Sequence, residues 1–163
     1  MSQNPTLRFA LRFALAFVVA DVVYLAATAQ PWWATFIALC VAKPSGVVIN
    51  LLGAQHVLAV GSALHGQQVT LNIQSGCDGV EAFLILFAGI VASRSGLYAK
   101  SIAVLVASVL ILSINTLRIA ALFFTKLSIP AYFDLVHSVI GPMFIVGTGM
   151  AAFWLWMTRQ SVL

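Results

Sequence analysis

Charged side chains are scarce in this sequence. Its 163 residues include 8 Lys or Arg and 4 Asp or Glu, so 7% of the chain is charged whereas 62% is hydrophobic. Because soluble domains carry about 25% charged residues, this composition excludes a soluble protein and indicates an integral membrane protein. The apolar runs are long and unbroken, which excludes a membrane β-barrel, whose strands alternate. We therefore expect an all-α membrane protein, since only helices and closed barrels satisfy their backbone in lipid.

Cysteine and histidine are also few. The two cysteines, Cys40 and Cys77, are too few for a disulfide framework, and His56 and His65 lack the spacing of metal ligands. We therefore expect neither a metal site nor a cofactor. Cys40 lies within an apolar run and is interpreted as a small hydrophobic residue.

Four segments are predicted to span the membrane, at about residues 7–28, 79–93, 101–124 and 135–157. A span needs about 20 apolar residues, so the second is short and places Cys77 at or just inside the membrane surface. The first also resembles a signal peptide, but its apolar stretch exceeds the usual limit of about 15 residues. We interpret it as a retained anchor and expect residues 1–163 to form one membrane domain, a bundle of four transmembrane helices.

The basic residues flank the predicted spans. The net charge of +4 would hint at nucleic acid in a soluble protein, but here it reports topology, and no nucleic-acid partner is expected. The residues concerned are Arg8, Arg12, Arg94, Lys100 and Arg159. By the positive-inside rule both termini are cytoplasmic, and residues 30–76 lie on the other side, with Lys126 as a mild exception.

This outer segment, residues 30–76, is expected to be structured. Its apolar pieces, WWATFIALCVAK and SGVVINLLG, each look too short to cross, and Trp32 and Trp33 favour the headgroup level, so we predict one or two extracytoplasmic interfacial helices. The stretch QQVTLNIQ alternates apolar and polar residues and predicts a half-buried strand. We expect a small β-hairpin in which HVLAV is its partner.

Three reactive side chains are predicted to lie at a similar depth. Counted from the basic residues at the cytoplasmic ends, Cys77, Arg118 and His137 lie roughly 26, 27 and 33 Å along their spans. Tilt and a kink at Pro142 absorb the difference. Because ionisable groups within spans are costly, a shared level on three spans indicates a functional site.

Four further polar residues accompany these three. Asn115 is three residues before Arg118 and shares its helix face. Asp134 precedes His137 by three residues, where it is expected to cap the fourth span and orient the imidazole. Asp78 and Glu81 have the spacing of a capping box, which would make Cys77 an N-terminal helix residue whose thiolate the helix dipole favours.

Each residue also has a simpler interpretation. A lone arginine near a helix end commonly extends to the headgroups, as Arg118 would, and a histidine beside an aspartate is often only a cap interaction. Asp78 and Glu81 fit simple dipole partners, and Asp21 in the first span has no partner that the sequence identifies. The simpler readings leave the common depth of the three side chains unexplained, and we therefore favour a site.

The ordered motifs resemble those of the exosortase/archaeosortase family. SGCDGVE stands at the head of one predicted span, NTLR near the outer end of the next, and FDLVHSVIG opens the one after. The resemblance extends from near Pro31 to Arg159 and is to compact, four-span members. Many relatives carry a small or hydroxyl residue where this chain has Asp78, which puts the charge state of the thiol in question.

The resemblance implies a membrane-embedded cysteine transpeptidase or protease of the bacterial plasma membrane, with its active site facing outward. Cys77 matches the nucleophile, Arg118 the essential arginine and His137 the essential histidine. The implied partners, besides membrane lipid, are C-terminal sorting signals of exported proteins, similar to the PEP-CTERM plan of a short motif, a hydrophobic helix and a basic end.

Two other functions stay open at this point. A non-enzymatic transport protein would continue its polar residues to the cytoplasmic side, but the sequence there is nearly all apolar. A thiol-handling or metal-handling subunit would need a CxxC pair or clustered histidines, and the sequence has neither.

Overall fold

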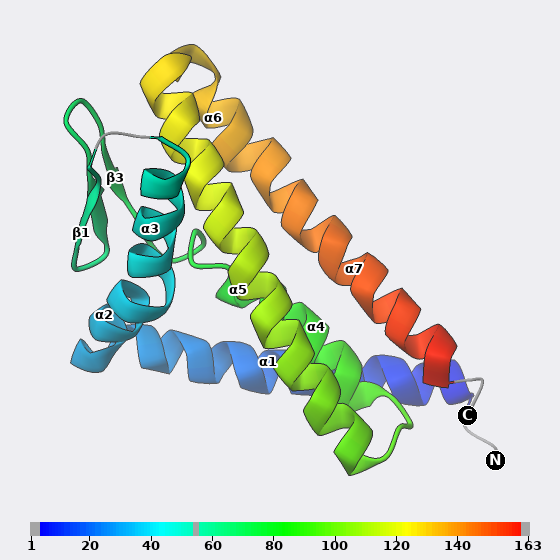
Figure 1. Cartoon of the computed structure of the whole chain (residues 1–163). Helices are drawn as coiled ribbons and strands as arrows, with labels where there is room; N and C mark the ends of the chain where they lie inside the picture. The colour runs from blue at the N-terminus through cyan, green and yellow to red at the C-terminus, as the bar shows by residue number, and fades with distance from the viewer. Residues whose placement is uncertain (1–3, 54–55, 161–163) are drawn as a thin grey trace.

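The structure, a computed structural model, describes residues 4–53 and 56–160 and consists mostly of helices (Figure 1). The long helices are α1 (Pro5–Thr28), α4 (Val80–Ala92), α5 (Leu97–Ser128) and α7 (Gly141–Gln160). The shorter elements are α2 (Pro31–Ile37), η1 (Ala38–Ala42), α3 (Lys43–Leu51), β1 (Leu58–Val60), β2 (Ala63–His65), β3 (Thr70–Asn72), η2 (Pro130–Tyr132), α6 (Phe133–Leu135) and η3 (Val136–Ile140).

Four helical stretches are long and apolar enough to cross a membrane, namely Pro5–Thr28, Pro31–Leu51, Leu97–Ser128 and Pro130–Arg159. The prediction of an all-α membrane protein with four such helices is therefore confirmed, but one member of the set differs. The predicted span at residues 79–93 is the 13-residue helix α4, which is about 20 Å long and shorter than the hydrocarbon core.

The expectation that the apolar pieces of residues 30–76 are too short to cross is wrong, because they join into one stretch. Sequence reasoning divided them at Lys43 and Pro44, but the helix continues from Pro31 to Leu51. Proline lacks an N–H and normally breaks a helix. Here the turn before Pro44 is wound as a π-helix, η1, which accommodates the missing donor. Pro142 has the same arrangement, because it follows the π-helical turn η3.

The small sheet is a three-stranded antiparallel meander in the order β1-β2-β3. The predicted alternation is confirmed, because Leu71 and Ile73 are buried whereas Thr70 and Asn72 are exposed. The predicted partner is wrong: β3 pairs with Ala63–His65, and the HVLAV strand lies beyond it. The turn between β2 and β3 begins at Gly66, whose N–H bonds Val69 O at 2.9 Å.

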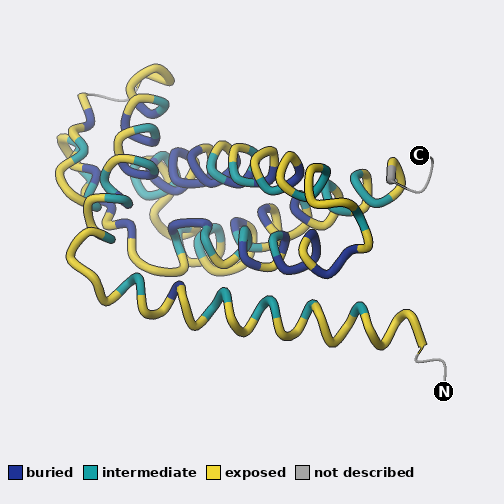
Figure 2. The backbone as a smooth tube through the Cα atoms, turned by 90° about the horizontal axis from the view of Figure 1, so that it is seen from below, coloured by how far each residue is buried: buried dark blue, intermediate teal, exposed yellow. Residues whose placement is uncertain are grey.

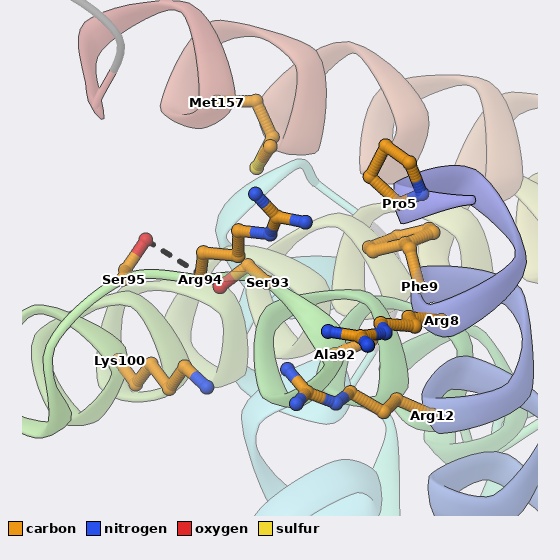
Figure 3. Close-up of a pocket in the computed structure, with 10 residues that line it drawn as sticks. All are labelled: Pro5, Arg8, Phe9, Arg12, Ala92, Ser93, Arg94, Ser95, Lys100 and Met157. Carbon is orange, nitrogen blue, oxygen red and sulfur yellow. Dashed lines mark hydrogen bonds between the residues drawn. The ribbon is translucent and has the colours of Figure 1, made fainter. Parts of the chain in front are cut away.

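The basic residues gather at one end of the bundle. The start of α1, the turn between α4 and α5 and the end of α7 lie together there (Figure 1). Arg8, Arg12, Arg94 and Lys100 line a cavity of about 690 Å³ at this end (Figure 3), which we call the basic end. The grouping agrees with the expected topology, and its cytoplasmic side stays a prediction.

Two apolar cores divide the rest of the molecule. The inner core joins α4, α7 and the first half of α5, whereas the outer core joins Pro31–Leu51, the sheet and the second half of α5. Helix α1 lies against α4, and the helix that begins at the N-terminus in Figure 2 is mostly exposed. Tyr24 is the one buried residue of α1. Because β3 leads into α4, the loop between them lies where the two cores meet.

Candidate active site

Cys77 lies in the loop between β3 and α4, on a turn whose shape depends on glycine. Its N–H donates to Gln74 O at 2.9 Å. Gly76 and Gly79 on either side have φ of +85° and +81°, a region that other residues rarely adopt. Helix α4 begins only at Val80, so the expectation that Cys77 is an N-terminal helix residue is wrong: the left-handed Gly79 separates the thiol from the helix.

The second half of α5 supplies two buried side chains that face this turn, as their spacing predicted. Asn115 donates from Nδ2 to Cys77 O at 3.0 Å. Arg118 reaches Cys77 Sγ from Nη2 at 3.9 Å and donates from the same nitrogen to His137 O at 3.2 Å. The guanidinium therefore contacts both the thiol and the segment that carries the imidazole.

His137 completes the group from the π-helical turn η3. Its Nδ1 lies 3.5 Å and its Nε2 3.8 Å from Cys77 Sγ. The ring stacks on Phe133, with centroids 5.6 Å apart and planes inclined by 5°, and Lys126 Nζ lies 5.5 Å from the centre of the Phe133 ring. The structure thus brings Cys77, Arg118 and His137 together from three segments that are distant in the sequence.

Asp78 forms a second, buried contact behind the thiol. Its Oδ1 accepts from Val80 N at 3.0 Å, and its Oδ2 accepts from the Tyr24 hydroxyl at 2.9 Å. Sequence reasoning missed Tyr24 and singled out Asp21 in the same helix, because an ionisable residue within a span is the stronger signal. A polar aromatic residue in an otherwise aliphatic stretch of α1 was the available signal. The bond joins α1 to the turn that carries Cys77.

Opposing influences set the charge of the thiol. Burial raises the pKa of Cys77 above its ordinary value, the Arg118 guanidinium lowers it, and the neighbouring Asp78 raises it further. Burial likewise raises the pKa of Asp78, against the bonds from Val80 and Tyr24 that lower it. Arg118 is therefore the group at this site that favours the thiolate, against burial and Asp78.

Two glycines allow the side chains to approach this closely. A Cβ on Gly79 would lie 2.9 Å from Asn115 Cγ, and a Cβ on Gly141 would lie 2.5 Å from Arg118 Nε and 3.0 Å from Val136 O. Both glycines are therefore required by the packing around α5.

Several predicted residues do not join the group. Asp134 is exposed and has no bond to the imidazole, which stacks on Phe133 instead. Glu81 is also exposed, and the capping box is not formed, because Asp78 bonds Val80 directly. Asp21 has no hydrogen bond or ion pair with the residues described. Cys40 packs at the edge of the outer core.

A cavity of about 470 Å³ opens beside the three side chains. Its wall includes the run of residues 70–77, and Lys126, Phe133 and Pro142 close its other sides. Arg118 Nε and Asn115 Oδ1 are buried without a hydrogen-bond partner among the described residues. Within residues 4–53 and 56–160, no group of three His, Cys, Asp or Glu side chains is placed to hold a metal ion. The arrangement is suited to attack by a thiolate on a carbonyl held in the cavity.

Comparison with known proteins adds one result. A sequence model that describes the transmembrane exosortases matches residues 4–155 of the chain. No curated protein and no solved structure matches it.

Proposed function

The chain belongs to the transmembrane exosortase family, and from this premise we propose that it cleaves C-terminal sorting signals of exported proteins through a thioester on Cys77. Family membership supports a membrane-embedded sorting transpeptidase in general. The single observation that carries the finer proposal is the contact of Cys77 Sγ with both the His137 imidazole and the Arg118 guanidinium.

In the first half-reaction, His137 accepts the proton of the Cys77 thiol. The thiolate attacks the scissile carbonyl carbon, and negative charge develops on the carbonyl oxygen. Arg118 stabilises this charge, because it is always ionised and its Nη2 lies 3.9 Å from Cys77 Sγ. When the C–N bond breaks, His137 returns its proton to the leaving amine, and the exported part stays on Cys77 as a thioester.

In the second half-reaction, His137 takes a proton from the acceptor, which is water or an amine. The acceptor attacks the thioester carbonyl, Arg118 again stabilises the oxyanion, and the sulfur leaves as a thiolate. Release of the product restores the free thiol and neutral imidazole after one proton returns from His137. No metal or cofactor is needed to balance these steps.

The rest of the bundle fits a substrate that carries its own membrane helix. An apolar hollow of about 300 Å³ lies between α1, α4 and α7, lined by Phe13, Ile85 and Met150 among others. Gly147 on α7 is exposed, and nothing lies within 4 Å of its missing Cβ, so another helix can approach closely there. We place the basic end on the cytoplasmic side of the plasma membrane and Cys77 toward the outside.

The inner core gives no support to a transport path. Between the site and the basic end, the buried residues of α4, α5 and α7 are all apolar, and they include Leu86, Ile111 and Ile145. A path for ions or polar metabolites would need polar groups at this level.

The test uses the chain's second thiol as a matched control. Membranes that contain the full-length protein are combined with an exported protein of the same genome whose C-terminal tail has the three-part plan. Cys40→Ala should process the tail at the wild-type rate, whereas Cys77→Ala should not process it. Wild-type protein should form an adduct with the exported part that hydroxylamine releases, and an impermeant thiol reagent should label Cys77 from outside. Processing by Cys77→Ala would overturn the proposal.

A further inference from the structure

The free edge of the sheet borders the active-site cavity. Strand β3 pairs with β2 on one side only, and no further strand of the described residues covers its other side. Thr70, Leu71 and Asn72 line the same cavity as Cys77, Arg118 and His137. Edge strands present unpaired N–H and C=O groups to any extended peptide that comes near. The edge of β3 is therefore a backbone template that borders the same cavity as the reacting sulfur.

The hydrogen bonds of the sheet identify which residues of β3 face this edge. Ile73 N donates to Ser62 O and Gly66 N to Val69 O, both at 2.9 Å. In an antiparallel pair these bonding positions alternate, so Val69, Leu71 and Ile73 bond toward β2. Thr70 and Asn72 must then point their main-chain groups outward, and Thr70 O does accept from Lys126 Nζ on α5, at 2.9 Å.

Asn72 is the open position on this edge. On one side of it Thr70 O is occupied by Lys126, and on the other Gln74 O accepts from Cys77 N. Within residues 4–53 and 56–160, no group bonds the outward N–H and C=O of Asn72. One donor and one acceptor are the pair that an added strand uses at every second residue.

We propose that the residues of the sorting signal just before the scissile bond bind as an added strand on β3, paired to the main chain of Asn72. This rests on the proposed function. The substrate runs from its exported part, past Cys77, into the membrane, and β3 also runs toward Cys77 before α4 descends to the basic end. The two strands are therefore parallel.

The length of the cavity sets the length of the recognised peptide. Lys126 lies two turns beyond Arg118 on α5, about 12 Å along the helix. An extended chain covers this distance with roughly three to four residues. Main-chain pairing tolerates many sequences, so selectivity comes from the side chains that point toward Lys126 and Phe133.

The first test measures catalysis with a matched pair of proline substitutions. In Asn72→Pro the lost N–H is the outward one, so the β2 pairing stays intact. Ala59→Pro removes an equivalent outward N–H from the opposite edge, because Leu58 and Val60 are the β1 residues that bond toward β2. The genome-derived tail should be processed about tenfold more slowly by Asn72→Pro and at the wild-type rate by Ala59→Pro. Alkylation of Cys77 by iodoacetamide should not change in either.

The second test needs no catalysis and uses Asn72→Cys in a chain that also carries Cys40→Ala and Cys77→Ala. Single cysteines are placed at six successive positions before the cleavage point of the tail. Disulfide cross-links should form at every second position, whereas Ala59→Cys should form none. Cross-links without this alternation, or a wild-type rate for Asn72→Pro, would overturn the edge proposal. Processing by Cys77→Ala would instead overturn the proposed function, and the cross-linking result would still stand by itself.

Discussion

The two ends of this molecule hold their polar side chains in different ways. At the active site, each group has a specific partner from another segment: Asn115 bonds Cys77 O, Arg118 bonds His137 O, and Tyr24 bonds Asp78. At the basic end, four cations surround an open cavity, and no carboxylate of the described residues lines it (Figure 3). Lys100 donates to Val91 O, a main-chain atom only nine residues away.

This difference separates two kinds of constraint. The basic end depends on the sign of its charges, since any cation favours the cytoplasmic side. The site depends on the positions of individual atoms, since the guanidinium must reach two partners at once. A substitution that preserves charge or hydrophobicity should therefore be tolerated at the basic end and damaging at the site.

The largest contrast is expected from the same substitution made at both ends. Arg118→Lys keeps the positive charge but loses the guanidinium, whose Nη2 contacts both Cys77 Sγ and His137 O. Loss of one oxyanion donor costs on the order of a hundredfold in rate, so tail processing should fall by about that factor. Arg94→Lys should process within about twofold of wild type. Equal rates for the two variants would contradict the comparison.

A smaller contrast is expected from a single methyl group. Gly141→Ala places Cβ within 2.5 Å of Arg118 Nε, so the side chain must move. A displacement of this kind costs on the order of tenfold to a hundredfold in rate. Gly96→Ala, at the turn of the basic end, meets nothing within 4 Å. It should leave the rate unchanged, and a wild-type rate for Gly141→Ala would show that Arg118 adjusts without loss.

The bond between Tyr24 and Asp78 should matter for stability as well as rate. Tyr24→Phe removes a donor from a buried carboxylate, which costs about 1–3 kcal/mol. Thermal unfolding in detergent should move to lower temperature, and processing should fall several-fold because the Cys77 turn loses its anchor on α1. Tyr98→Phe is the matched control at the basic end, because Tyr98 is 81% exposed. The two variants should differ, and identical melting curves would remove this anchor.

Features that repeat along one helix could be predicted from the sequence, whereas contacts between helices could not. The three-residue spacing of Asn115 and Arg118 predicted that they share one face of a helix. The positions of the basic residues predicted which helix ends lie together. Counting residues along the helices predicted that Cys77, Arg118 and His137 meet, because the rise per residue of a helix is nearly constant, and their depth in the membrane stays a prediction. The lengths of the two apolar pieces and the strand partner were wrong because π-helical turns and a three-residue strand leave no clear periodicity. The interfacial position of these helices stays a prediction.

The contact between Tyr24 and Asp78 shows the limit of such reasoning. The two residues are 54 positions apart, and neither lies on a pattern that identifies the other. Asp134 has a spacing from His137 that favours a contact, yet the two side chains do not bond. The imidazole stacks on Phe133 instead. Which neighbour holds a side chain is decided by packing between segments, and one sequence does not encode it in its local spacing.

The smallest effect expected is a change in the pH at which the thiol ionises. Asp78 raises the pKa of Cys77 and Arg118 lowers it. Asp78→Asn should therefore lower that pKa, so that alkylation of Cys77 by iodoacetamide begins at lower pH than in wild type. Arg118→Met should move the profile the other way. Measured in the Cys40→Ala chain, Glu81→Gln should leave the profile in place, because Glu81 is exposed and has no part in the shift. A profile that moved equally with Glu81→Gln and Asp78→Asn would mean that the thiol responds to net charge, as the basic end does, and the contrast between the two ends would disappear.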